Sequence, residues 1–212
     1  MIETNVMKVQ MAYFFKDDSS FKSFDLISLL YNEFKDSFKS EPQILSTPVD
    51  APKEIPRFMW KYENKTIMFS GLRIDISLGV PSGVDWILVT KDFSSKIESV
   101  IEKFNIQIDR VGIITENSIN DNVTNLLDKH IKINSFNKAE EKNISWLERK
   151  DIFNKWTNIY INEQKHETNV MFDINSFPEI KLTSIHTNFK STMNKAIDEM
   201  KGMIENVWYF NK

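Results

Sequence analysis

Apolar and polar residues alternate between positions 6 and 15, near the start of the chain. The apolar side of an extended backbone would carry Val9, Met11, Tyr13 and Phe15. The opposite side would carry Lys8, Gln10 and Ala12. A period of two is typical of a strand with one buried face, because successive side chains point to opposite faces. The pattern therefore predicts a β-strand that lies on a core.

The period changes after this strand. Residues 17–20 read DDSS and supply short oxygen-bearing side chains that can cap a helix. Apolar residues then recur at helical spacing, at Phe24, Ile27, Leu30, Tyr31, Phe34 and Phe38. Pro42 disfavours helical backbone in the residue before it. We therefore expect an amphipathic helix that ends near Ser40.

Three prolines, Pro48, Pro52 and Pro56, lie between this helix and the next apolar pattern. They could belong to a docking peptide for another protein or to a stiff connection within the fold. Proline fixes its backbone angle and lacks an N–H donor, so the stretch can form neither a helix interior nor a central strand. The spacing is P-x-x-x-P rather than the P-x-x-P of SH3-type ligands. We favour an extended structural crossover that leads into the strands that follow.

Strand-like alternation dominates the middle of the chain. Residues 58–79 predict a β-meander that turns at Glu63–Lys65 and then continues as one strand. A helix should begin near Thr90 or Asp92, and residues 108–117 predict the next strand.

Signals are weaker beyond residue 118, where a short helix could carry Val123 to Ile131 and residues 137–143 read as a solvated loop. Further strands are predicted at residues 155–164, 168–175 and 179–188.

The clearest helix closes the chain after a cap at Thr187 or Asn188. Its apolar stripe carries Phe189, Met193, Ala196, Ile197, Met200, Met203, Ile204, Val207 and Trp208. The stripe could cover a sheet, or its methionines could form an adaptable surface for a partner. We favour a core position, since helices of this kind usually bury their stripe within their own domain.

The predicted helices separate blocks of hairpin-linked strands. This order indicates an α+β fold with a mostly antiparallel sheet rather than a regular βαβ alternation. We expect two or three amphipathic helices on one side of the sheet, with a long helix at the C-terminal end. The length suits a single domain, 1–212, or two intertwined halves, 1–117 and 118–212.

Composition narrows the function classes. The net charge of -3, from 27 basic and 30 acidic residues, does not favour nucleic acid or an anionic membrane as a partner. The chain has no Cys, which excludes disulfides and thiol chemistry. We expect a cytoplasmic protein, because the sequence shows neither a signal peptide nor a run of roughly 18 apolar residues.

Residues that could carry catalysis form no recognisable motif. His130, His166 and His186 lie far apart, and the five glycines form no phosphate-binding loop. We therefore predict no metal and no cofactor. The remaining enzymatic hypothesis is a metal-dependent hydrolase or nuclease with dispersed ligands. Its candidates are Asp75, Asp173, Glu163, His166 and His186.

One resemblance rests on the Pro-rich stretch, the hairpin of residues 62–79 and the strand that contains Arg110, Val111, Gly112 and Asn117. These features resemble a sporadically distributed prokaryotic and phage family of unknown function, with residues 50–117 and the closing helix matching in most detail. That family tends to have a second arginine where Ile114 stands here. The resemblance implies a bacterial or phage-borne protein of mobile-element or phage-conflict systems, and it implies no chemistry.

Together these observations favour a non-enzymatic module that binds a protein partner or forms a homo-oligomer, in an accessory, chaperone-like or antitoxin-like role. Exposed sheet edges and the closing helix are the expected contact surfaces. Candidate partner-binding residues are Arg57, Trp60, Arg110, Asn117, Met200 and Met203. Arg57 and Trp60 belong to a basic and aromatic segment that could also stack nucleobases, although core packing explains its alternation better.

Overall fold

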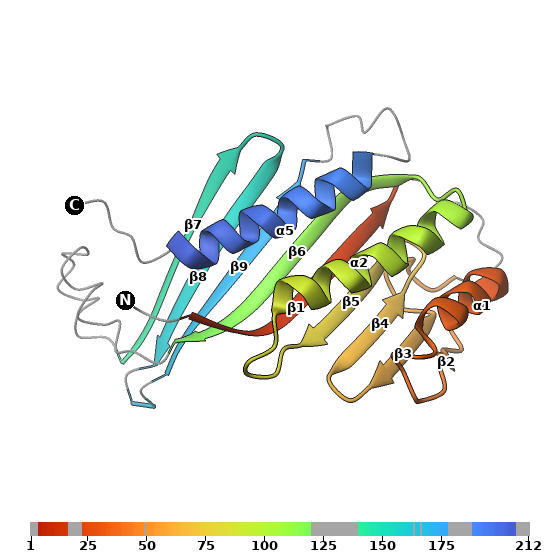
Figure 1. Ribbon diagram of the computed structural model, residues 1–212, viewed down its shortest axis with the longest axis horizontal. Helices are drawn as coiled ribbons and strands as arrows, with labels where there is room; N and C mark the ends of the chain where they lie inside the picture. Colours follow the sequence, from red (N-terminus) through yellow and green to blue (C-terminus); the bar gives the residue numbers. More distant parts are fainter. Residues whose placement is uncertain are drawn as a thin grey trace.

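A computed structural model describes most of the chain. The described residues are 4–16, 23–48, 50–119, 140–162, 164–165, 167–177 and 188–206. Within these ranges the chain forms nine strands in a single antiparallel sheet and three helices that lie on one face of it (Figure 1). The predicted α+β class, the meanders, the one-sided helices and the long closing helix are confirmed.

The elements follow the chain in a simple order. The N-terminal part contains β1 (Thr4–Phe15), α1 (Ser23–Phe34), β2 (Gln43–Ile44), β3 (Phe58–Tyr62), β4 (Lys65–Phe69), β5 (Arg73–Gly79) and α2 (Trp86–Lys103). The C-terminal part contains β6 (Ile108–Ile119), β7 (Glu141–Lys150), β8 (Phe153–Asn162), β9 (Glu167–Ser176) and α5 (Asn188–Asn206).

The sheet has an internal likeness about its centre. Its strand order is β2-β3-β4-β5-β1-β6-β9-β8-β7, with β1 and β6 paired in the middle. On each side a central strand is followed, further along the chain, by a three-stranded meander and then by a helix on the covered face. The strand order therefore divides the chain between α2 and β6, and the expected boundary at residue 117 falls inside β6.

The core lies between this sheet and the helices. The four apolar residues predicted to share one face of the first strand are all buried. The stripe of α5 is also buried, at Phe189, Met193, Ala196, Ile197 and Met200, which confirms the core position of this helix. None of the helices in the described ranges combines the length and the apolar character that crossing a lipid bilayer requires.

Two helix boundaries differ from the prediction. The helix α1 ends at Phe34, well before Ser40, and Tyr31 on its predicted stripe is 40% exposed. The helix α2 begins at Trp86, because the Asp85 carboxylate accepts hydrogen bonds from the backbone N–H groups of Ile87 and Leu88 at 2.9 and 3.3 Å. The expected starts at Thr90 or Asp92 are therefore wrong: those residues lie inside the helix.

The strand predicted after the turn at Glu63 is interrupted. Ser70 Oγ accepts from the backbone N–H groups of Leu72 and Arg73, both at 3.2 Å, and this turn separates β4 from β5. The prediction of one continuous strand is wrong here, because a small hydroxyl competes with the ladder for backbone donors.

The proline stretch is folded rather than extended. Ala51 N–H donates to the Pro48 carbonyl and Ile55 N–H donates to the Pro52 carbonyl, both at 3.1 Å, which gives two successive turns. Gly71 N–H donates to the Lys53 carbonyl at 2.9 Å and ties the stretch to the β4–β5 turn. The expected extended backbone is therefore wrong, and the stretch connects β2 to β3.

One strand was not predicted at all. Residues 141–143 were expected in a loop, yet they open β7, which pairs with β8 along its whole length. The predicted cap at residues 17–20 and the short helix at 123–131 lie outside the described residues. So does the strand predicted at 179–188, except for its last residue, Asn188, which begins α5.

Candidate interaction site

The six predicted contact residues do not gather in one place. Trp60, Asn117 and Met200 have no exposed surface, so the structure places them in the core. The Trp60 indole donates to the Ser40 carbonyl at 2.8 Å and stacks against Tyr31, with ring centroids 5.5 Å apart.

Arg57 is partly exposed just before β3, and Met203 is partly exposed on α5. Arg57 and Met203 are far apart on the sheet. The strand β3 lies on one side of the central pair β1 and β6, whereas α5 packs on β6 and β9.

The strand that carries the Arg-Val-Gly resemblance has a structural account. Arg110 lies on the face of the sheet away from the helices, with its guanidinium carbon 3.9 Å from the centre of the Phe14 ring. Arg73 approaches the same ring at 5.5 Å. The Asn175 side chain occupies the space over Gly112, where an added Cβ would lie 2.5 Å from its Oδ1 atom.

Asn117, the last residue of that motif, joins two strands from inside the core. Its Nδ2 group donates to the Val170 carbonyl at 2.9 Å and to Thr115 Oγ1 at 3.0 Å. Packing and strand linkage therefore explain why arginine, glycine and asparagine suit these positions.

The carboxylates of the hydrolase hypothesis do not converge. Asp75 lies on β5 and Asp173 on β9, with β1 and β6 between them, so about 14 Å separates their strands. Burial raises the pKa of Asp75, opposed by the nearby Arg73, and burial also raises the pKa of Asp173. Among the described residues no three acidic or imidazole side chains could hold a metal ion together. Glu163, His166 and His186 lie outside the described residues.

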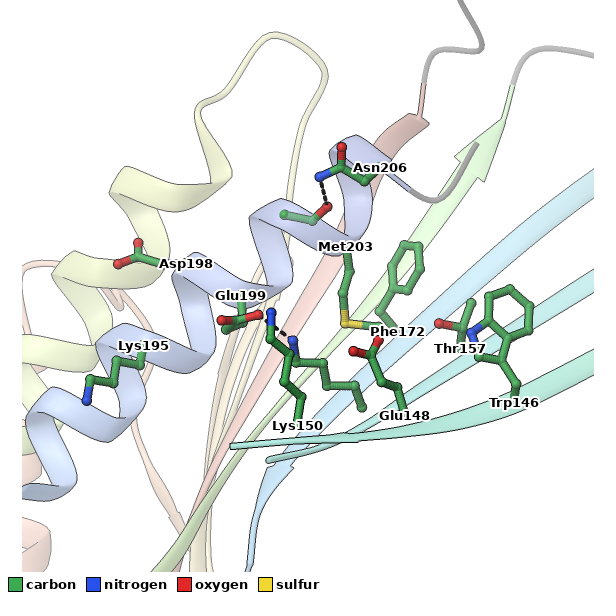
Figure 2. Close-up of a pocket in the computed structure, with 12 residues that line it drawn as sticks. Trp146, Glu148, Lys150, Thr157, Phe172, Lys195, Asp198, Glu199, Met203 and Asn206 are labelled. Carbon is green, nitrogen blue, oxygen red and sulfur yellow. Dashed lines mark hydrogen bonds and ion pairs between the residues drawn. The ribbon is translucent and has the colours of Figure 1, made fainter. Parts of the chain in front are cut away.

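A groove runs between α5 and the outer strands β7 and β8 (Figure 2). Its volume is about 650 Å³. The strand side presents Trp146, Glu148, Lys150 and Thr157, and the helix side presents Glu199 and Met203. The groove exists because α5 packs on β6 and β9, so that β7 and β8 extend beyond the helix.

Charge within the groove is balanced. Lys155 is almost completely buried and forms an ion pair with Glu199 on α5. Asp198 pairs with Lys91 of α2 at 3.0 Å, which joins the two long helices. A groove with both signs of charge suits a polypeptide better than an anionic polymer.

The strand β7 forms the outer edge of the sheet beside this groove. Only β8 pairs with it among the described residues, so its other edge carries unpaired backbone donors and acceptors there. Trp146 in its middle is 43% exposed. Sequence reasoning missed this strand, and the available signal was the alternation of Ile144 and Trp146 with polar residues.

A second apolar cluster lies on the uncovered face of the sheet. Trp156 and Tyr160 on β8 are 39% and 37% exposed, and Met171 on β9 is 38% exposed. Met171 lies opposite Asn158, between the two aromatic residues, so the three side chains are neighbours.

Comparison with known proteins assigns no family to the chain. No protein-family model matches it, and a search of curated proteins finds no match.

Proposed function

We propose that the chain acts by binding a protein partner, either another protein or a second copy of itself, through strand addition at β7 with side chains of the partner entering the adjacent groove. The proposal rests on the outer edge of this ten-residue strand, with which no other strand of the described residues pairs. An extended segment that adds to a sheet edge gains main-chain hydrogen bonds, and neighbouring pockets supply selectivity.

The composition around the edge supports a protein partner. Trp146 and Met203 offer the aromatic and methionine surface that protein interfaces favour. Glu148 and Lys150 supply both charges at the rim. The chain as a whole has a net charge of -3, which gives no attraction for nucleic acid.

The cellular setting in this proposal is a cytoplasmic bacterial or phage-borne system. It rests only on the resemblance of the Arg110-to-Asn117 strand. The accessory role, chaperone-like or antitoxin-like, belongs to the same proposal.

Proline substitution in β7 tests strand addition. Successive residues of an edge strand direct their N–H groups alternately toward the sheet and outward, so one of Ser145→Pro and Trp146→Pro removes an outward backbone donor and spares the ladder with β8. That variant should keep its unfolding midpoint and lose the proteins that co-purify with the parent chain from cells. The other variant should lose stability and serves as the control.

The proposal is wrong if the stable proline variant retains the same co-purifying proteins in the same amounts. A backbone donor at the outer edge would then be irrelevant to binding.

A further inference from the structure

Charged residues at the two ends of β7 follow opposite orders. Glu140 directly precedes β7, whose first two positions are Glu141 and Lys142, and the last three positions are Glu148, Arg149 and Lys150. Counted inward from the two ends, the residues at corresponding positions carry opposite charges. An antiparallel copy of the same strand can therefore meet opposite charges at both of its ends.

Symmetry limits how two copies of β7 can pair. A two-fold axis perpendicular to the sheet makes the strands antiparallel and keeps each side chain on its own face. One residue then faces itself at the axis, and neighbours pair outward from it. The central residue can be Ile144, Ser145 or Trp146.

Charge selects one of these three registers. Centring on Ser145 places Glu140 opposite Lys150, Glu141 opposite Arg149 and Lys142 opposite Glu148. Two-fold symmetry repeats each pair.

The neighbouring registers bring like charges together. Centring on Ile144 places Glu140 opposite Glu148, and centring on Trp146 places Lys142 opposite Lys150. Like charges directly opposite each other on paired strands are destabilising.

We propose that the partner strand at β7 is β7 of a second copy, paired antiparallel about Ser145, so that two nine-stranded sheets join into one. This inference rests on the proposed strand addition and names its occupant. Ile144 then lies opposite Trp146 of the second copy on the helix-covered side, and the dimer buries two indoles that are 43% exposed in the single chain.

The exposed pairs carry the argument. Glu140, Glu141, Arg149 and Lys150 are all exposed, and the carboxylates of Glu140 and Glu141 accept hydrogen bonds from Gln164 and Asn162 of the same chain. Lys142 is buried and also has an interaction within the chain. Charges that merely protect an edge from aggregation need no such order. Opposite charge orders at the two ends are what a self-complementary edge requires.

The other edge of the sheet lacks this property. The strand β2 has only two residues, and Pro42 directly precedes it. A short edge bounded by proline offers little template for pairing. Dimerisation through β7 therefore closes the one long edge that the described residues leave open.

Charge reversal tests both the dimer and its register. Glu141→Arg alone places arginine opposite arginine twice, and Arg149→Glu alone places glutamate opposite glutamate twice. Each variant should dimerise about tenfold more weakly than the parent, because two attractive pairs become repulsive. An equal mixture restores opposite charges at both positions and should form a heterodimer of parental affinity.

Sedimentation equilibrium of each variant and of the mixture measures these affinities. Glu54→Arg and Lys39→Glu reverse exposed charges near the opposite edge and should leave dimerisation unchanged. Circular dichroism and unfolding midpoints establish that all variants are folded.

The inference is overturned if the parent chain stays monomeric up to hundreds of micromolar. It is also overturned if the mixture dimerises no more tightly than either variant alone. A monomeric parent whose co-purifying protein is lost with the tolerated β7 proline variant would leave strand addition intact and assign it to a different partner.

Discussion

The two edges of the sheet differ in how far helices and side chains cover them. At the β2 end, α1 covers the sheet, and Phe34, Phe38 and Trp60 fill the space beneath it. At the β7 end, the face toward the helices carries a groove with Trp146 and Glu148 on its strand side (Figure 2). Both tryptophans occupy outer strands, yet one is fully buried and the other is 43% exposed.

This difference indicates that the β2 end contributes mainly to stability and that the β7 end is available for binding. Aromatic packing fixes the first end and leaves only a two-residue edge strand. The second end keeps a ten-residue edge strand, β7, and the covered face of β7 and β8 includes the buried lysines Lys142 and Lys155. The internal likeness of the two halves therefore does not extend to their outer strands, and the β7 end is where we place binding.

Truncating the two tryptophans should give the largest contrast. Trp60→Ala removes a fully buried indole and its hydrogen bond to Ser40, and we expect a loss of about 3–5 kcal/mol in the free energy of unfolding. Trp146→Ala should change that free energy by less than about 1 kcal/mol and should weaken self-association. Urea unfolding at low protein concentration measures the first effect without interference from assembly. Equal losses for the two variants would contradict the contrast.

The buried ion pair beside the groove should give an intermediate effect. Glu199→Gln leaves the Lys155 ammonium buried without its counter-charge, and we expect a loss of about 1–2 kcal/mol, moderated because Glu199 is one-third exposed. The double variant Lys155→Met, Glu199→Leu should recover most of this loss, since it removes both charges. Unfolding in urea measures the free energy of unfolding of each variant. A double variant that is less stable than Glu199→Gln would show that the ion pair itself stabilises the fold.

Glu98 should give the smallest effect, visible as a dependence on pH. Burial raises the pKa of this carboxyl, which accepts a hydrogen bond from Ser94 at 2.8 Å and contacts Tyr13. The folded state then binds the proton more tightly than the unfolded state, so stability is highest below the ordinary value of 4.5 and falls as the pH rises through the raised pKa.

Glu98→Gln should reduce this fall, because its side chain does not titrate. Part of the slope should remain, since the pKa values of Asp75 and Asp173 are raised as well. Unfolding midpoints measured across the acid range compare the two proteins. A steeper fall in the variant would show that the assigned direction is wrong.

The sequence predicted the elements whose burial is one-sided and continuous. The alternation around Tyr13 and the stripe from Phe189 to Met200 each satisfied a single period, so β1 and α5 were evident. Boundaries set by one capping side chain were missed, because Asp85 and Ser70 look like ordinary loop residues until their backbone partners are known.

The candidate site was harder to predict than the fold. Trp60 looked like a contact residue, yet its environment depends on α1, which is distant in the sequence. The strand β7 carries charges at both ends, so its pattern resembled a solvated loop. The groove arises from the lateral offset between α5 and the outer strands, and no local pattern in the sequence encodes that offset.

Hydrogen exchange along the sheet tests the central claim most directly. Half of the amides in residues 141–150 point away from β8 and should exchange rapidly at low micromolar concentration. At hundreds of micromolar these same amides should become protected, while the amides of residues 58–62 near the opposite edge should show no dependence on concentration. Protection that is equally weak at both concentrations would contradict the assignment of β7 as a self-pairing edge.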